Sequence, residues 1–197
     1  MGIDYMKSKL CQVIVGIDEV GRGSWAGPLL VVAACATAKL PKGLADSKSL
    51  TKIQREQLYE ELIETCRFGE GWVQPEEIDE FGLAQAMRIA VSRALIMLAP
   101  SFRTKIIMDG KVNYCPNEYK NVKCLVRADA LKPIVSAAGI YAKVKRDKHM
   151  ADISRFYPDY NFEKHVGYGT ADHLEAIKTH GICPLHRKSF KPIKAFI

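Results

Sequence analysis

Four acidic residues stand close to the ends of short apolar segments, a placement that suits metal-assisted catalysis: Asp18, Glu19, Asp109 and Asp129. If the apolar segments are neighbouring strands of one sheet, the four carboxylates meet at one edge of it. Carboxylates within a few ångströms of one another repel and raise each other's pKa, and divalent cations compensate for that repulsion. The pattern therefore predicts a metal-binding cluster of acids.

The chemistry of the donor atoms narrows the kind of metal. Oxygen ligands without neighbouring histidine or cysteine favour a hard ion, Mg²⁺ or Mn²⁺, over zinc. Two such ions, about 3.5 to 4 Å apart, can hold the attacking and leaving oxygens of a phosphodiester during an in-line displacement. A single aspartate at the end of a strand is usually a turn or cap residue, but four acids in such places favour the metal interpretation.

A glycine-rich turn follows the first two acids, with the sequence Gly21-Arg22-Gly23. Glycines there let the backbone approach a ligand without a Cβ in the way, so that its amides and carbonyls can meet a sugar hydroxyl. Arg22 can bind a phosphate through two parallel hydrogen bonds. A plain hairpin turn explains the same three residues, so this pattern is weak by itself.

The 197-residue chain carries a formal net charge of +7 that is unevenly distributed. Residues 1–119 hold 14 Lys and Arg against 15 Asp and Glu, while residues 120–197 hold 15 against 7. A basic C-terminal third favours a polyanionic partner, with a solvated surface as the alternative. Part of the surplus falls on one expected helix, at Lys143, Lys145, Arg146 and Lys148.

The hydrophobic pattern predicts the elements that have to position these residues. Apolar segments predict strands at 12–17, 25–38, 68–74, 105–108 and 122–126. Amphipathic spacing and capping residues predict helices at 49–64, 75–99, 133–148 and 170–180. Strands and helices alternate after an initial antiparallel pair. This predicts an α/β fold in which helices flank a mixed β-sheet, with a helical C-terminal extension.

Hydrophobic residues make up 48% of the chain, enough for a domain with a real core. The longest apolar run, Leu29–Ala38, is too short to cross a bilayer, so we expect no membrane span. The first residues lack the features of a secretion signal, and six cysteines without metal-ligand spacing suit reduced core thiols, so we expect a cytoplasmic protein. His165, His173 and His186 also lack ligand spacing and are expected to pack or to bond to backbone.

Several longer motifs occur in order along the chain. The first is Gly-Ile-Asp-Glu-Val-Gly-Arg-Gly-Ser-Trp-Ala-Gly-Pro at 16–28, and the later ones are Asp46–Lys48, Met108–Gly110, Arg127–Ala130, Ala142–Asp147, Gly167–Thr170, His173–Leu174 and Pro184–Phe190. Together they resemble the signature of the ribonuclease HII family, from about residue 12 to residue 192. The departures from the family pattern are minor: Ser24-Trp25, Arg127-Ala128 and Gly139. Arg22 stands where the sister type, ribonuclease HIII, carries lysine.

The resemblance implies a ribonuclease H-like fold and metal-dependent endonucleolytic cleavage of RNA in RNA–DNA hybrids, including single ribonucleotides embedded in duplex DNA. It implies a cut on the 5′ side of the ribonucleotide that leaves 3′-hydroxyl and 5′-phosphate ends. Residues 1–150 would form the catalytic domain, and residues 151–197 a helical extension packed on it. We expect the protein to act as a monomer.

Three groups of residues take site roles by motif position. The catalytic ligands of two Mn²⁺ or Mg²⁺ ions correspond to Asp18, Glu19, Asp109 and Asp129. The turn that recognises the 2′-hydroxyl of the ribonucleotide corresponds to Gly21, Arg22 and Gly23. Tyr168 corresponds to the tyrosine that packs on the sugar of the following deoxynucleotide, and Lys48 is a candidate phosphate contact.

Two other functions fit part of the pattern. Another nuclease on the same fold, such as a junction resolvase, would use the carboxylates but leaves Gly21–Gly23 and Tyr168 without a role. A non-catalytic duplex-binding module explains the basic third, but bare carboxylates would repel phosphate. Asp147 also has two interpretations, an acid that supports the metal ligands or the helix partner of Lys143.

Overall fold

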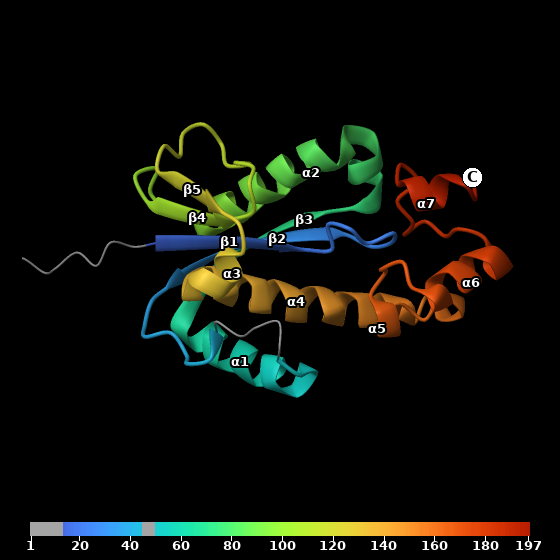
Figure 1. Ribbon diagram of the computed structural model, residues 1–197, viewed down its shortest axis with the longest axis horizontal. Helices are drawn as coiled ribbons and strands as arrows, with labels where there is room; N and C mark the ends of the chain where they lie inside the picture. The colour runs from blue at the N-terminus through green and yellow to red at the C-terminus, as the bar shows by residue number, and fades with distance from the viewer. Residues whose placement is uncertain (1–13, 45–49) are drawn as a thin grey trace, which may run out of the picture.

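A five-stranded mixed sheet forms the centre of the computed structural model, which describes residues 14–44 and 50–197 (Figure 1). Its strands are β1 (Ile14–Val20), β2 (Leu29–Ala36), β3 (Cys66–Val73), β4 (Lys105–Asp109) and β5 (Val122–Leu125). The strand order is β3-β2-β1-β4-β5; β2 is antiparallel to β1 and β3, and β4 is parallel to β1 and β5. The sheet confirms the expected α/β class.

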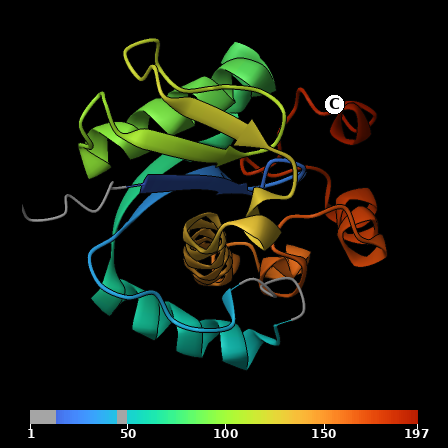
Figure 2. The ribbon, with the colours of Figure 1, turned by 60° about the vertical axis from the view of Figure 1, so that its left-hand side comes forward.

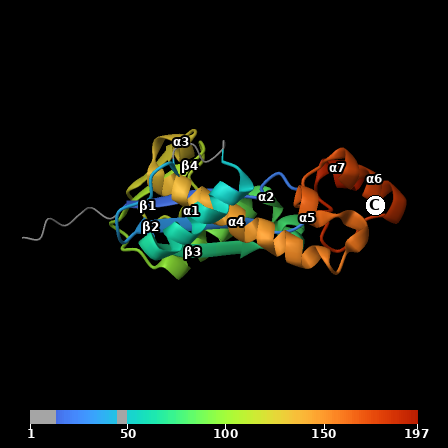
Figure 3. The same ribbon diagram turned by 90° about the horizontal axis from the view of Figure 1, so that it is seen from below.

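Helices cover both faces of the sheet (Figure 2). On one face lies α2 (Pro75–Leu98), and on the other lie α1 (Lys52–Thr65) and α4 (Pro133–Ser154). The shorter helices are α3 (Ala128–Leu131), the 3-10 helix η2 (Pro158–Tyr160), α5 (Phe162–His165), α6 (Ala171–His180) and α7 (Lys191–Lys194). From α5 onward they gather at one end of the molecule, where α4 extends past the sheet (Figure 3).

Local chemistry explains where several elements begin. Helix α1 starts after Thr51, whose side chain accepts a hydrogen bond from the backbone N–H of Gln54 while the Gln54 side chain accepts one from the backbone of Thr51. The strand expected at 25–38 begins only at Leu29. The backbone N–H groups of Trp25 and Ala26 donate to the carbonyl of Gly167 instead of to a neighbouring strand.

Glycines bring the covering helices close to the sheet. A Cβ on Gly71 of β3 would lie 1.8 Å from the carbonyl oxygen of Ala90 in α2, and a Cβ on Gly16 of β1 would lie 2.5 Å from the backbone of Ile134 in α4. In the described part of the chain, α2 is the one helix long and apolar enough to cross a membrane. Because α2 packs closely on β3, its apolar composition is that of a core helix.

The C-terminal helices surround a hydrophobic cluster of their own. Its fully buried members include Met150 of α4, Phe162 of α5, Ile177 of α6 and Ile193 of α7. Helix α4 runs unbroken through position 150 to Ser154, so it contributes both to the core under the sheet and to this cluster. The division into a catalytic domain and an extension at residue 150 stays a prediction, and α4 joins the two parts.

Two buried arginines tie the C-terminal part to the segment between β1 and β2. The guanidinium of Arg146 donates to three backbone carbonyl oxygens, those of Ala26, Pro28 and Val166. The guanidinium of Arg187 donates to two more, those of Arg22 and Gly27. Arg146 therefore does not belong to a basic surface that could meet a polyanion, because its side chain is fully buried and its donors are engaged by backbone.

Three histidines lie inside the C-terminal part: His165, His173 and His186. The rings of His165 and His173 stack with centroids 4.4 Å apart, and the Nε2 atoms of His173 and His186 are 3.1 Å apart. Each ring also meets a backbone group, as expected from the absence of ligand spacing. Burial lowers the pKa of His173 and of His186 to about 4 and also lowers the pKa of His165, so all three are neutral at pH 7.

These histidines should make the folded protein less stable as the pH falls from about 6.5 to about 4. In that range the unfolded chain protonates histidines of ordinary pKa, about 6.5, while the fold keeps His173 and His186 neutral. In this range, each histidine lowers the free energy of unfolding by up to about 1.4 kcal/mol per pH unit as the pH falls. Above pH 6.5 this loss of stability is absent. NMR titration of the ring protons measures the folded pKa directly; midpoints near 6.5 for His173 and His186 would contradict the prediction.

Candidate active site

Asp18 and Glu19 lie inside β1, near its end, rather than after it. The strand continues to Val20 because its backbone pairs with β2, where Asp18 is opposite Val32 and Glu19 is opposite Val31. Neighbouring side chains on a strand point to opposite faces of the sheet. Asp18 therefore faces α4, and Glu19 points toward the face that α2 covers.

Asp109 is the last residue of β4, as predicted, and it is the neighbour of Asp18 in the sheet. Met108 pairs with Ile17 in the parallel register of β4 and β1, so the next residue on each strand is an acid. Oδ1 of Asp109 accepts a hydrogen bond of 2.6 Å from the backbone N–H of Ala128. This bond joins the end of β4 to the start of α3.

Asp129 lies in the first turn of α3, so the prediction that it ends a strand is wrong. Strand β5 stops at Leu125, and Arg127 adopts a left-handed backbone conformation with a φ of 57° that turns the chain into α3. A left-handed residue other than glycine is uncommon and has no signal in the apolar pattern. The helix still presents Asp129 as a buried acid beside the sheet.

The four acids share one electrostatic environment. Burial, followed by the negative charges of Glu19, Asp109 and Asp129, raises the pKa of Asp18 well above its usual range. Burial also raises the pKa of Glu19, an effect that Arg22 opposes and Asp109 reinforces. The arrangement carries a surplus of negative charge that divalent cations would neutralise.

Protein groups hold two of these carboxylates in place. Oδ1 of Asp18 accepts a hydrogen bond of 2.8 Å from the N–H of Glu19, and Oε1 of Glu19 lies 3.5 Å from Nη1 of Arg22. Among the described residues, no three acidic, histidine or cysteine side chains form a closed metal-binding group. The donor set nevertheless fits hard divalent ions because it consists of carboxylate oxygens. Binding them requires these side chains to turn toward one another.

Gly139 of α4 makes room for the carboxylate of Asp18. A Cβ at position 139 would lie 2.3 Å from Oδ2 of Asp18, closer than non-bonded atoms approach. Glycine at position 139 therefore lets the Asp18 carboxylate lie directly against α4. A larger residue there would require this carboxylate to shift.

The two glycines of the Gly21–Gly23 turn have different tasks. Gly21 has a φ of 81°, and a Cβ there would lie 2.2 Å from Nε of Arg146. Gly23 has no such backbone conformation, and a Cβ on it would meet nothing within 4 Å. The fold therefore requires glycine at position 21, whereas Gly23 leaves open space that a ligand can enter.

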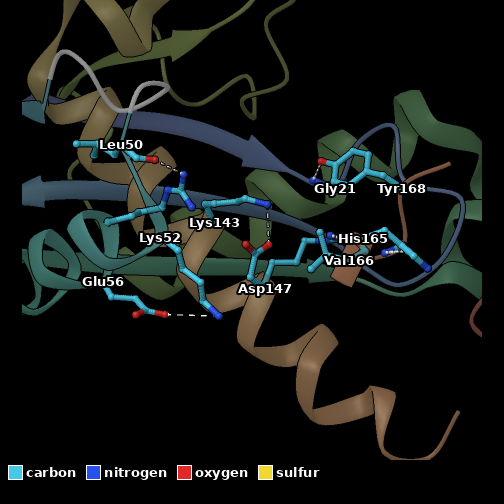
Figure 4. Close-up of polar contacts among 12 residues, drawn as sticks. Gly21, Leu50, Lys52, Glu56, Lys143, Asp147, His165, Val166 and Tyr168 are labelled. Carbon is cyan, nitrogen blue, oxygen red and sulfur yellow. Dashed lines mark hydrogen bonds and ion pairs between the residues drawn. The ribbon is translucent and has the colours of Figure 1, made fainter. Parts of the chain in front are cut away.

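Tyr168, in the loop between α5 and α6, contacts this turn (Figure 4). Its phenol oxygen accepts a hydrogen bond of 3.2 Å from the backbone N–H of Gly21, and the guanidinium of Arg146 lies 5.7 Å from its ring centroid. The residue is 36% exposed. The structure therefore brings the tyrosine expected to pack on a sugar next to the turn expected to meet a 2′-hydroxyl.

The remaining predicted residues have different outcomes. Lys48 lies outside the described residues. Asp147 forms an ion pair of 2.8 Å with Lys143 (Figure 4), which supports its interpretation as a helix partner. Lys145 pairs with Glu70 at 3.2 Å. Two of the basic side chains on this helix, Lys143 and Lys145, thus already have acidic partners.

Two side chains that no sequence pattern singled out, Arg187 and Tyr114, support the turn. Nη1 of Arg187 donates to the carbonyl oxygen of Arg22 at 3.1 Å, and Nη2 of Arg22 lies 3.5 Å from the phenol oxygen of Tyr114. For Arg187 the available signal is its place in the Pro184–Phe190 motif. Tyr114 stands in a segment without any motif.

The family comparison covers almost the whole chain. The family model described as Ribonuclease HII matches residues 15–193. Ribonuclease HII of Thermotoga maritima is 40% identical over 98% of this chain and 79% of its own length. Ribonuclease HII of Coxiella burnetii is 40% identical over 98% of this chain and 96% of its own length.

Solved structures agree with the sequence comparison. A chain of the PCNA:RNase HII complex from Archaeoglobus fulgidus has a TM-score of 0.77 and 27% identity, covering 91% of this chain and 95% of that chain. Ribonuclease H2 from Pyrococcus horikoshii has a TM-score of 0.71 and 28% identity, covering 93% and 96%. The chain belongs to the ribonuclease HII family, endoribonucleases that act on RNA–DNA hybrids.

Proposed function

We propose that this protein cuts the RNA strand of RNA–DNA hybrids and also cuts on the 5′ side of single ribonucleotides embedded in duplex DNA. The products carry 3′-hydroxyl and 5′-phosphate ends. Two divalent ions, Mg²⁺ or Mn²⁺, would support the attacking water and the leaving 3′ oxygen. The residues proposed to hold them are Asp18, Glu19, Asp109 and Asp129.

One observation carries the proposal: β1 leads directly from the acids to the turn that Tyr168 contacts. Asp18 and Gly21 are three positions apart on one chain segment, and the N–H of Gly21 bonds to the phenol of Tyr168. A nucleotide whose sugar lies against the turn and the tyrosine would therefore carry its phosphate to the acids. Recognition and chemistry would act on the same linkage.

The residues of the turn supply the contacts that this selectivity needs. A protein distinguishes RNA from DNA at one nucleotide through the 2′-hydroxyl or the sugar shape. Gly23 leaves backbone open for the hydroxyl, and the exposed part of Tyr168 offers a flat surface for the neighbouring sugar. The side chain of Arg22 is 47% exposed, so it can exchange Glu19 for a phosphate.

The direct test uses three duplexes: DNA with one embedded ribonucleotide, an RNA–DNA hybrid, and DNA alone. With Mg²⁺ or Mn²⁺, the first two should be cut on the 5′ side of a ribonucleotide and the third left intact, and a chelator should stop all cleavage. Cleavage of all-DNA junctions would instead favour a resolvase. Binding of every duplex without cleavage would favour a binding module.

Two further expectations belong to this proposal. The exposed Lys148 of α4 is a candidate contact to the duplex backbone, since its neighbours Lys143 and Lys145 are paired with acids.

We also propose that the protein acts as a monomer, which light scattering of the purified protein tests directly. The cytoplasmic location stays a prediction.

Asp109→Asn should lower cleavage by on the order of 100-fold or more, because one ligand charge worth several kcal/mol in the transition state is lost. The amide oxygen can still accept from Ala128, and the loss of a charge relieves repulsion on Asp18 and Glu19. In chelator, the variant should therefore melt no lower than wild type, while the rise in Tm on adding Mn²⁺ should shrink. The exposed Asp159→Asn is the matched control; normal turnover of folded Asp109→Asn in Mg²⁺ would remove the acid from the catalytic set.

Gly23→Ala should fold normally and still cleave the single-ribonucleotide duplex at least about 10-fold more slowly, because the methyl group enters the space proposed for the sugar. Gly21→Ala is the contrasting variant: its left-handed backbone and the contact with Arg146 should cost about 1–3 kcal/mol of stability. Thermal melts and cleavage rates of both variants separate the two roles. Normal cleavage by Gly23→Ala would place recognition elsewhere.

Tyr168→Ala should lower cleavage of the single-ribonucleotide duplex by about 10- to 100-fold through lost positioning of the sugar. Tyr168→Phe keeps the ring and loses only the acceptor for the N–H of Gly21, so its cleavage rate should be closer to that of the wild type. The stabilisation by Mn²⁺ and the affinity for all-DNA duplex should be unchanged in both variants. Loss of the Mn²⁺ effect, or unfolding, would mean that the tyrosine is structural.

A further inference from the structure

A chain of hydrogen bonds runs through two buried histidines to the backbone of Tyr168. We propose that His173 and His186 are positioning residues: held in opposite neutral tautomers, they fix the Tyr168 carbonyl and so hold the phenol ring at the Gly21–Gly23 turn. The inference rests on the proposed function of Tyr168. It adds two histidines of the C-terminal part to the apparatus that recognises the ribonucleotide.

The two tautomers follow from the contact with Tyr168. Nδ1 of His173 faces the carbonyl oxygen of Tyr168, which can only accept, so a neutral His173 carries its proton on Nδ1 and accepts at Nε2. The proton between the two rings therefore belongs to Nε2 of His186. That Nε2 lies 3.1 Å from Nε2 of His173 and donates to it.

The backbone contacts of His186 fit this assignment. Its Nδ1 carries no proton and accepts from the N–H of Cys183 at 2.9 Å, and the carbonyl oxygen of Cys183 lies 3.2 Å from the same nitrogen. Nδ1 of His173 lies 2.9 Å from the carbonyl oxygen of Tyr168 and donates to it. The polarity therefore runs in one direction, from the Cys183 amide through both rings to Tyr168.

Packing keeps the two rings in this orientation. His173 and His186 are 0% and 1% exposed. The ring of His165 stacks on His173 with a centroid distance of 4.4 Å, and the ring of Trp25 lies 5.6 Å away. Reorienting either ring would leave buried polar atoms without partners, which is costly in an interior of low dielectric constant.

Tyr168 depends on these contacts because burial alone does not fix it. The residue is 36% exposed and stands in a loop between two helices. Its carbonyl accepts from both His173 and the N–H of Thr170, and its N–H donates to the carbonyl of His165. Those bonds orient the peptide groups on either side of Tyr168 and thereby aim the phenol at Gly21.

The same segment of chain that starts the relay also holds the recognition turn. His186 forms an isolated β-bridge with Ala26, and its neighbour Arg187 donates to the carbonyls of Arg22 and Gly27. One anchor therefore sets the position of the turn directly and of Tyr168 through the histidines.

Two matched variants at position 173 separate positioning from packing. His173→Asn places an amide N–H near the former Nδ1 and can still donate to Tyr168, whereas His173→Gln places its amide near the former Nε2 and can only meet His186. Both remove the imidazole ring, so their melting temperatures should be similar. His173→Gln should cleave the single-ribonucleotide duplex about 10-fold more slowly than His173→Asn, with the difference in kcat rather than in KM.

NMR of the wild-type protein tests the tautomers without any mutation. At pH 7, the ¹⁵N shifts should show His173 protonated on Nδ1 and His186 protonated on Nε2. A His173 protonated on Nε2, or a cationic ring in either residue, would overturn the inference even if both variants failed to fold.

Tyr168→Ala distinguishes failure of this inference from failure of the proposed function. If Tyr168→Ala impairs cleavage but His173→Asn and His173→Gln cleave equally well, the tyrosine matters and the histidines do not position it. If Tyr168→Ala cleaves normally, the role of the tyrosine falls and the positioning inference falls with it. A slow His173→Gln together with a slow Tyr168→Ala and the stated tautomers supports the inference.

Discussion

Repulsion among four carboxylates is the constraint that the rest of the structure has to satisfy. Burial and neighbouring negative charges raise the pKa of Asp18, so the acids would move apart if their backbones allowed it. The frame does not allow it. Asp18 and Glu19 are on a central strand with partners on both sides, and Asp109 ends the strand next to it. A bound proton or a bound cation can then relieve the repulsion, and a divalent cation neutralises several of the carboxylates at once, so the rigidity of the sheet favours metal binding.

The sheet can serve as that frame because both of its faces are packed closely. The glycines of β3 let α2 approach to backbone contact, Gly16 lets α4 do the same along β1, and Gly139 leaves room on α4 for the Asp18 side chain. Apolar burial on both faces of β1 stabilises the fold against the repulsion that the acids introduce. The same glycines bring a helix to the back of the Asp18 carboxylate, so the residues that stabilise the core also shape the site.

The sequence predicted the sheet and the place of Asp109 at the end of a strand because both depend on local patterns. Short apolar segments and the places where they end are visible in the residue order, although β1 continues through Asp18 and Glu19 because its backbone pairs with β2. Asp129 was assigned to the wrong element because a left-handed Arg127 starts a helix where an ordinary residue would continue the strand. The burial of Arg146 was not visible in the sequence, where a charged residue suggests a surface position. Its partners are backbone carbonyls far away in the sequence, and such long-range contacts leave no trace in the hydrophobic pattern.

If the turn after β1 recognises a ribonucleotide through its backbone, as proposed, the buried arginines of α4 and of the last segment have a functional task. A side chain that recognises a ligand can be positioned by its own rotamer, but a peptide group can be positioned only by fixing the chain around it. The turn after β1 is fixed by guanidinium donors from Arg146 and Arg187, which satisfy carbonyls that would otherwise be buried without partners. Because these donors come from α4 and from the last segment of the chain, the geometry of the turn depends on residues far from the acids. The proposed selectivity for a ribonucleotide would therefore be open to change through the C-terminal part while the four carboxylates stay in place on their strands and α3.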